Sequence, residues 1–351
     1  MSPATQTTSA IIEQLFAELD PRQKKVLTKR YGLDNGEEMT LAELGKLFNV
    51  TRERIRQIEA LAINEVKKRA KNGHIDSIVK AAVDKLKTTG GVRKESHLLE
   101  DIKHFSETKD LATSFANHVR FLLELSKDVM YHREDNQLFS HWHLSAIHQK
   151  RALDFLEHLV KHLKERKHET LHDKRFHEFF GDVMKLHKME EKVADHYLSI
   201  SKKFSKNMYG DFGLTDWEEV NPKVSRDWIY LVLQKAGRPL HFSEIAEEIR
   251  KIRQVKMTNT QTIHNELIKD KRFILVGRGI YGLRELDQLP SGTIRDILVY
   301  ILKAEGPMKA KDIITKVLKH RIFKENTILF NLQNKKYFER SASGEYMVKS
   351  K

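Results

Sequence analysis

Residues 40–69 read TLAELGKLFNVTRERIRQIEALAINEVKKR and hold two helical patterns separated by a short break. Thr40 and Glu43 stand three residues apart, the spacing of a capping box, which satisfies free amides at the start of a helix. The apolar residues that follow have helical spacing, and they are Leu41, Leu44, Leu47 and Phe48. Asn49 and Val50 interrupt this pattern, and Thr51 can cap a second helix. The stretch therefore predicts two helices joined by a tight turn.

The second helix carries an apolar face and an opposite face of different chemistry. At about 100° per residue, Ile55, Ile58 and Ala62 share one side. The residues on the opposite side are Glu53, Arg56, Gln57 and Ala60. An arginine can bind guanine through two hydrogen bonds, a glutamine can bind adenine, and a glutamate can accept from cytosine. We interpret this face as a reader of base edges in DNA, whereas the alternative is the solvated face of an ordinary surface helix.

A longer stretch, residues 19–69, reads LDPRQKKVLTKRYGLDNGEEMTLAELGKLFNVTRERIRQIEALAINEVKKR and resembles region four of primary bacterial sigma factors. The run VTRERIRQIEA is the most specific part of the resemblance, and Gly32 suits the C-terminal cap of the preceding helix. In that family the second helix enters the major groove of the upstream (minus thirty-five) promoter element. The resemblance implies a DNA-contacting set made of Arg22, Thr51, Arg52, Glu53, Arg54, Arg56 and Gln57. Leu61 and Asn64 depart from the basic residues that are common at these positions in the family.

The end of the second helix adds a basic cluster, Lys67, Lys68 and Arg69, followed by Lys71. Clustered lysine and arginine side chains favour contacts with DNA phosphates, which are strong and sensitive to salt. We therefore add Lys67, Lys68 and Arg69 to the predicted DNA-binding residues. Gly73 is the expected end of the helix.

In the sigma family this domain also docks on the flap of RNA polymerase, so the resemblance implies core polymerase as a partner. A full sigma factor carries a further, upstream domain that opens the promoter, and only a short arm precedes Leu19 here. We therefore expect a sigma-like initiation or regulatory factor that binds promoters in a sequence-specific way without melting them alone. The alternative is an RNA polymerase accessory subunit of delta type, or a protein-interaction scaffold.

The composition is consistent with a polyanionic partner. The chain of 351 residues has 63 Lys and Arg against 49 Asp and Glu, a formal net charge of +14. It has no cysteine, which excludes disulfides and thiolate chemistry. No apolar run approaches the roughly 20 residues that span a bilayer, and no signal peptide precedes the first helix. We expect a cytoplasmic protein, bound to the nucleoid if the source is a bacterium.

The predicted fold class is mainly α, with a helix-turn-helix domain over residues 1–73 followed by tandem winged-helix units. Residues 74–144 show three helical patterns and then apolar runs at 129–132 and 137–140 around a polar turn, which predicts a β-hairpin. Residues 145–220 are predicted to be helical, with a helix from Met184 to Lys203, and could repeat the same order. Because the array has apolar faces of its own, we expect it to fold without residues 1–73.

Residues 221–290 contain PLHFSEIAEEI, TIHNELIKDKRF and LVGRGIYGL, and they resemble a HARE-type helix-turn-helix domain. They are similar also to the N-terminal domain of the RNA polymerase delta subunit. HARE-type domains occur elsewhere with DNA modification or restriction, which gives a third class of function. Residues 291–351 repeat the pattern with one loop shortened by three residues, so we expect a second winged-helix unit there. Pro239 and Tyr281, for example, recur as Pro307 and Tyr346.

Other chemical signals are weaker. Gly277, Gly279 and Gly282 satisfy GxGxxG, but a second strand follows them, so we predict a hairpin rather than a phosphate site. His158 and His162 have helical spacing that could hold zinc. With no cysteine and no HExxH motif, we expect solvent-facing histidines and no metal site. No Ser/His/Asp arrangement or paired carboxylates can be recognised, so we expect no enzymatic activity and no cofactor.

Overall fold

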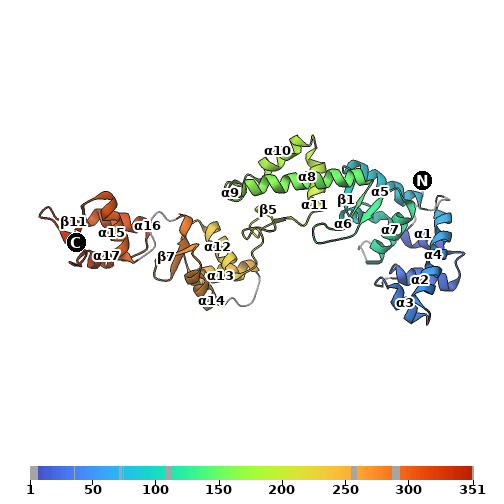
Figure 1. Ribbon diagram of the computed structural model, residues 1–351, viewed down its shortest axis with the longest axis horizontal. Helices are drawn as coiled ribbons and strands as arrows, with labels where there is room; N and C mark the ends of the chain where they lie inside the picture. Colours follow the sequence, from blue (N-terminus) through green and yellow to red (C-terminus); the bar gives the residue numbers. More distant parts are fainter. Residues whose placement is uncertain are drawn as a thin grey trace. The chain divides into compact units, whose positions relative to one another are not determined.

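The computed structural model describes residues 7–34, 36–70, 73, 75–106, 113–253, 259–286 and 293–349. The chain is mainly helical with small antiparallel sheets, as predicted (Figure 1). It divides into two compact units, Met1–Ser205 with Phe212–Leu214, and Lys206–Asp211 with Thr215–Lys351. Within the described ranges, no helix is both long and apolar enough to cross a membrane.

The first unit begins with the four helices of the helix-turn-helix stretch. They are α1 (Thr8–Phe16), α2 (Pro21–Arg30), α3 (Leu41–Leu47) and α4 (Arg52–Arg69). The predicted capping box is present, since Thr40 and Glu43 each accept a hydrogen bond from the backbone N–H of the other. Leu47, which we expected on the apolar face of α3, is 52% exposed.

Residues 75–144 follow with three helices and a three-stranded sheet. The elements are α5 (Asp76–Thr88), β1 (Val92–Lys94), α6 (Glu95–Asp101), the 3-10 helix η2 (Lys103–Phe105), α7 (Thr113–Ser126), β2 (Met130–His132) and β3 (His141–His143). The strands pair in the order β1-β3-β2, so the last strand is central. The sequence indicated the helices and a hairpin but not the short strand β1.

The predicted second hairpin strand at residues 137–140 is wrong, because β3 begins at His141. Asp135 Oδ1 accepts from the backbone N–H groups of Gln137 and Leu138, both at 2.7 Å, and thereby forms a turn. Lys202 N–H donates to the Gln137 carbonyl at 2.8 Å, and Phe139 N–H donates to the Ile200 carbonyl at 2.9 Å. These backbone groups are therefore engaged by residues 200–202, far along the sequence, rather than by β2.

Strand β3 also corrects the expectation of solvent-facing histidines. His141 and His143 are buried, with 0% and 5% exposure. The His141 ring bonds the Phe139 carbonyl through Nδ1 at 2.9 Å, and the His143 ring bonds the Ser145 carbonyl at 3.1 Å. Burial lowers the pKa of His141 to about 4 and also lowers the pKa of His143.

Residues 146–214 add a mainly helical segment. Its elements are α8 (Ala146–Glu165), α9 (Lys167–Leu171), α10 (Phe176–Leu186), α11 (Glu191–Ser199), β4 (Phe204–Lys206) and β5 (Phe212–Leu214). The predicted helix from Met184 to Lys203 is interrupted, since Lys188 has a positive φ of 49° between α10 and α11. Strands β4 and β5 form a two-stranded ladder, unlike the three-stranded sheet of residues 75–144.

The second unit holds two further sets of three helices and three strands. The first set is α12 (Ser225–Ala236), β6 (Leu240–His241), α13 (Phe242–Arg253), α14 (Thr260–Lys269), β7 (Phe273–Gly277) and β8 (Ile280–Leu283), then the 3-10 helix η3 (Arg284–Leu286). The second set is α15 (Ile294–Glu305), β9 (Met308–Lys309), α16 (Ala310–His320), α17 (Glu325–Leu332), β10 (Phe338–Arg340) and β11 (Glu345–Val348). Strand orders β6-β8-β7 and β10-β11-β9 again put the last strand in the centre. The GxGxxG run lies in the β7–β8 hairpin, as predicted, and its middle glycine, Gly279, is in the turn with a φ of +70°.

Each of these two sets has its own apolar core. Positions that correspond in the repeated sequence are buried in both sets, for example Ile245 with Ile313 and Phe273 with Phe338. The internal repeat read from the sequence is thus a repeat of core positions and of strand order.

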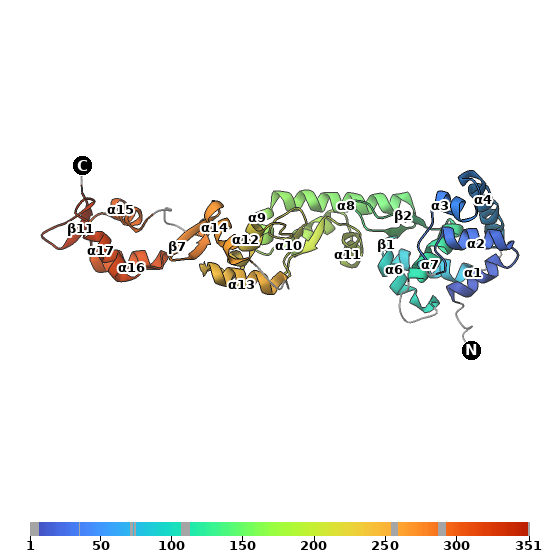
Figure 2. The same ribbon diagram turned by 90° about the horizontal axis from the view of Figure 1, so that it is seen from below.

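The core of the first unit crosses residue 73. One continuous cluster joins the apolar faces of α1 and the second half of α4 with those of α5, α6 and α7, and it reaches Trp142. Both views show α7 beside α1 (Figures 1 and 2). Phe121 of α7 makes edge contacts with Phe16 and Tyr31, with ring centroids 5.8 and 5.0 Å apart. Removal of residues 1–73 would expose the apolar faces of α5 and α7 to water. The expectation that the array folds without residues 1–73 therefore does not hold for residues 75–144, and it stays a prediction for the two sets of the second unit.

We predict that Phe121→Ala destabilises the helix-turn-helix and residues 75–144 together. Phe121 is 2% exposed, and truncation of such a ring costs about 3–5 kcal/mol. Hydrogen exchange should show amides of α1, α4 and α7 losing protection in parallel. The matched control is Phe330→Ala, because that ring is 77% exposed and its loss should change stability by less than about 0.5 kcal/mol. Retained protection of α4 in F121A would contradict a shared core.

We also predict that the first unit loses stability as the pH falls from about 6.5 to 4. The folded-state pKa of His141 is below that of a free histidine, so the unfolded chain binds more protons in this window and is favoured on acidification. Each pKa unit corresponds to about 1.4 kcal/mol, which sets an upper limit near 3 kcal/mol. Urea unfolding at several pH values should show a smaller pH slope for H141Q. The same pH slope in H141Q as in the parent would contradict His141 as the origin of the pH dependence. The control is His177→Gln, because His177 is exposed.

Candidate nucleic-acid interface

The turn between α3 and α4 is fixed by three local features. Asn49 adopts a left-handed conformation with a φ of +53° after α3, a conformation that asparagine tolerates better than most residues. A Cβ at Gly45 would lie 2.9 Å from the Val50 carbonyl oxygen, so the close approach of α3 to the turn requires glycine. The Thr51 hydroxyl then accepts from Arg54 N–H at 3.1 Å and caps α4.

A small apolar core holds α4 against α2 and α3. Its buried members are Val26, Leu44, Ile55 and Ile58. Ala62, the third residue predicted on the inward face, is fully buried in the larger core. The inward face of α4 is therefore the predicted one, and its orientation places the other side of the helix in solvent.

The predicted reading residues all lie in solvent on the first turns of α4. Thr51, Arg52, Glu53, Arg54, Arg56 and Gln57 are exposed. Arg56 binds Glu53 through two hydrogen bonds, Nη2 to Oε1 at 2.7 Å and Nε to Oε2 at 2.9 Å. This bonding to Arg56 holds the pKa of Glu53 below its usual range. Arg54 donates to Gln57 Oε1 at 3.1 Å, so the exposed side chains of this face are paired with one another within the helix.

Arg22, the predicted phosphate contact of α2, is exposed near the N-terminus of that helix. Its guanidinium lies 5.9 Å from the centroid of the Phe48 ring, and Lys25 Nζ lies 5.9 Å from the same ring. Phe48 directly precedes the turn that leads into α4. The structure therefore adds Lys25 to the cations near the turn. The sequence did not predict Lys25, because nothing in the sequence indicates that it lies near Phe48.

The second basic group is separate from the first. Lys67 follows Arg52 by 15 residues, which corresponds to about 22 Å along a helix. Lys68 is exposed and pairs with Glu65 at 2.9 Å. The Arg69 guanidinium donates to the Leu15 carbonyl at 2.9 Å and to Glu18 at 2.5 Å, and its contact with DNA stays a prediction. Arg69 therefore connects α4 to the end of α1. Lys71, which follows the predicted basic cluster, lies outside the described residues.

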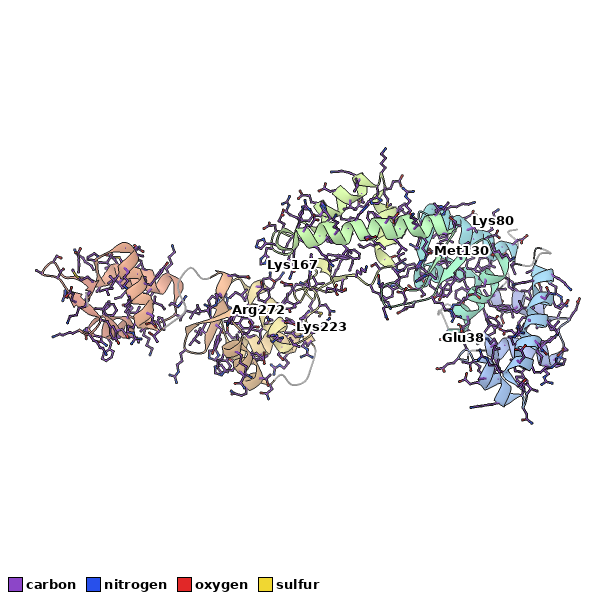
Figure 3. All side chains as sticks on the ribbon, in the orientation of Figure 1. Glu38, Lys80, Met130, Lys167, Lys223 and Arg272 are labelled. Carbon is purple, nitrogen blue, oxygen red and sulfur yellow. The ribbon has the colours of Figure 1, made fainter. Side chains whose placement is uncertain are left out.

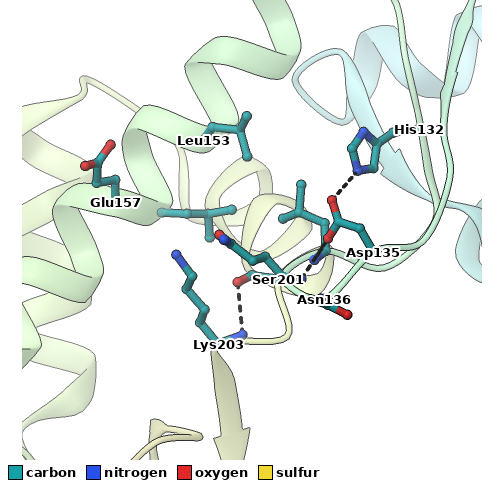
Figure 4. A pocket seen from close by; sticks show the side chains of 10 residues that line it. His132, Asp135, Asn136, Leu153, Glu157, Ser201 and Lys203 are labelled. Atoms are coloured by element: carbon teal, nitrogen blue, oxygen red, sulfur yellow. Dashed lines mark hydrogen bonds and ion pairs between the residues drawn. The ribbon is translucent and has the colours of Figure 1, made fainter.

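A hollow of about 690 Å³ lies outside this interface, beside α8 (Figure 4). Its wall includes Asp135, Glu157, Ser201 and Lys203. His132 Nε2 lies 3.1 Å from Asp135 Oδ2, and Lys203 N–H donates to Ser201 Oγ at 3.2 Å. These bonds stabilise the two loops that form the wall, so we assign the hollow no chemistry of its own.

The two histidines considered for zinc, His158 and His162, have different partners. His158 Nδ1 lies 2.7 Å from His187 Nε2, whereas His162 packs against the Phe179 ring. Among the residues that the structure describes, no group of three or more histidine or acidic side chains is placed to hold a metal ion.

Comparison with known proteins identifies two families, each over part of the chain. Residues 15–68 match Sigma-70, region 4. Residues 226–286 match HARE-HTH, a helix-turn-helix domain that the family description assigns to ASXL and restriction endonuclease proteins among others. The first match contains the α3–α4 interface, and the second contains the set from α12 to β8. No solved structure matches the chain.

The similar curated proteins are RNA polymerase sigma factors. RNA polymerase sigma factor SigA1 of Synechococcus elongatus is 46% identical over 69 residues, which is 20% of this chain and 17% of that protein. SigA of Clostridium acetobutylicum is 61% identical over 49 residues, 14% of this chain and 13% of that protein. The chain therefore spans less than a fifth of the length of these relatives. Within that span it carries a Sigma-70 region 4 domain, and farther along a HARE-HTH domain.

Proposed function

We propose that the protein binds duplex DNA at promoters in a sequence-specific way and acts with RNA polymerase as a sigma-like initiation or regulatory factor. The observation that carries the proposal is the outward face of α4. Arg56 and Gln57 are exposed there within a region that matches Sigma-70, region 4. Side chains of these types at the start of a helix suit base edges in the major groove.

Contacts with phosphates complete the proposed mode of binding. Arg22 and Lys25 lie at the start of α2, close to the Phe48 ring that precedes the turn. Cations beside an inserted helix position it on the duplex through phosphate oxygens, while base contacts supply specificity. Lys67 and Lys68, about four helical turns farther along α4, are left for a separate phosphate contact.

The partner and the remaining units belong to the same proposal. The relatives are named RNA polymerase sigma factors, which supports RNA polymerase as the partner of this chain. We infer that the three sets with three-stranded sheets are winged-helix modules, because each has the order helix, strand, helix, helix, strand, strand with the last strand central. In this proposal the protein acts through binding and not through catalysis.

We predict that Arg56→Ala or Gln57→Ala weakens binding to the preferred duplex by about 1–3 kcal/mol. Affinity for random duplex should change much less, because these side chains contact bases rather than phosphates. Selection of duplexes from a random library identifies the preferred site, and titration then compares the two DNAs. Equal losses on both would assign Arg56 and Gln57 to phosphates. Ala60→Ser, a change on the same exposed face, is the control.

We further predict that the protein alters initiation by a complete polymerase holoenzyme at some promoters and not at others. The selectivity should follow the upstream element and should disappear in the double variant R56A/Q57A. A point variant is preferable to deletion of residues 1–73, because the shared core would be lost in the deletion. In vitro transcription on promoters with and without the selected element measures the effect. Unchanged promoter choice by the double variant would contradict the assignment, and it would favour a delta-like accessory role.

A further inference from the structure

In the last set of helices and strands, residues 293–349, two cations contact the ring of one tyrosine, and two more lie close to this tyrosine along the backbone. Tyr337 directly precedes β10, and its ring lies 4.8 Å from the Arg295 guanidinium and 5.6 Å from Lys336 Nζ. Arg295 Nη1 also donates to the Tyr337 hydroxyl at 3.4 Å. The Lys349 N–H donates to the Tyr337 carbonyl at 2.9 Å, which brings Lys349 to the same edge of the sheet. With Lys335, these residues form what we call the cationic corner.

The cationic corner has little negative charge to balance it. Arg295 lies 3.3 Å from Asp296 Oδ1, and Asp296 also caps α15 by accepting from Thr293. Lys335, Lys336 and Lys349 are exposed. Within residues 293–349, no carboxylate lies within 4.0 Å of these three ammonium groups. The corner thus holds four cations and one paired carboxylate.

The preceding set, α12 to β8, provides an internal comparison. There Arg284 N–H donates to the Arg272 carbonyl at 2.8 Å, the bond that corresponds to Lys349 with Tyr337. Arg272, labelled in Figure 3, binds Asp270 at 2.7 Å, and it also lies 2.8 Å from Glu218 and 3.6 Å from Asp227. The corner of the first set is therefore a closed network of ion pairs.

The repeated sequence places Lys335 where the first set has Asp270, and Tyr337 where it has Arg272. Both sets nevertheless keep a complete apolar core and the same strand order. The fold therefore does not require the replacement of the Asp270 carboxylate by a lysine. Like charges held close together without counter-charge cost free energy in the free protein, which an anionic ligand would offset.

The distribution of charge along the chain also favours an anionic ligand for the last set. Residues 291–351 contain 13 Lys and Arg against 6 Asp and Glu, whereas residues 74–220 contain 24 against 25. The last set thus supplies half of the net charge of +14. A local positive excess of this kind attracts polyanions and makes their binding dependent on salt.

We propose that the cationic corner, Arg295, Lys335, Lys336, Tyr337 and Lys349, binds the phosphate backbone of duplex DNA as a second contact independent of sequence. Arginine, lysine and the tyrosine hydroxyl are all donors that proteins use for phosphate oxygens. The contact is separate from the α4 interface. The proposal of this second contact rests on the proposed function only in its choice of DNA as the polyanion.

The test uses the full chain and a duplex of random sequence. The double variant K335Q/K336Q should weaken binding about fivefold or more at moderate salt, and the slope of log affinity against log salt should fall by roughly one to two. The matched control is K309Q/K311Q, which removes the same charge from exposed lysines of β9 and the start of α16. Lys309 pairs with Glu345, away from the edge that holds Tyr337. The control should lose much less affinity.

An equal loss of DNA affinity in the two double variants would mean diffuse electrostatic attraction and would overturn the proposed site at the cationic corner. Unchanged DNA affinity of K335Q/K336Q would overturn it as well. Thermal unfolding should be unaltered, because the substituted lysines are exposed. A parallel titration with polyglutamate distinguishes DNA from an acidic polypeptide, and an equal loss of polyglutamate binding would overturn the DNA assignment. The loss on random duplex should persist in an R56A/Q57A background. This background separates the two proposals, because the effect of K335Q/K336Q is then measured without base contacts from Arg56 and Gln57.

Discussion

The packing of α7 against the helix-turn-helix is the contact on which the first unit depends. The core that α2, α3 and α4 form among themselves has four buried apolar residues. At about 1.5–3 kcal/mol each, these residues offset little of the entropy lost when some 60 residues are ordered. The apolar faces of α1 and the second half of α4 are covered by α5 and α7 instead. The Sigma-70 region 4 domain is therefore stable as part of a larger core, and residues 75–144 are part of its architecture.

Polar contacts on α7 give this packing a single arrangement. Asn117 Nδ2 donates to the Gly32 carbonyl at 3.1 Å, His118 bonds the Leu33 carbonyl at 2.8 Å, and Arg120 binds Glu38 at 2.8 Å. All three partners lie in the connection between α2 and α3. Gly32 has a φ of +60°, and a Cβ there would lie 2.7 Å from Asn117 Nδ2. The Asn117 and His118 bonds are buried, and hydrogen bonds weaken steeply when their angles change, so these two bonds fix the orientation of the connection between α2 and α3 on residues 75–144.

The sequence predicted the elements whose signals are local and missed those that depend on distant partners. Helices α3 and α4 could be predicted because caps and helical spacing act within a few residues. The caps are Thr40 and Thr51, and the spacing is that of Ile55 and Ile58. The two- and three-residue strands β1, β6 and β9 carry no such pattern. The run at 137–140 was misassigned because its partners lie near Ile200. The contact of Arg69 with the end of α1 was missed for the same reason, since its partners Leu15 and Glu18 are more than 50 residues away in the sequence.

The two copies in the second unit show why a match in fold does not carry function with it. Their buried positions correspond, but their surfaces diverge where a ligand would be met. On the third helix, the exposed Asn265 of α14 is replaced by Phe330 of α17. At the edge of the sheet, the paired carboxylate of Asp270 is replaced by Lys335. Core positions restrict both copies to one architecture, while exposed positions are free to change. Each copy must therefore be assigned a ligand from its own surface, and the cations of the last copy point to phosphate.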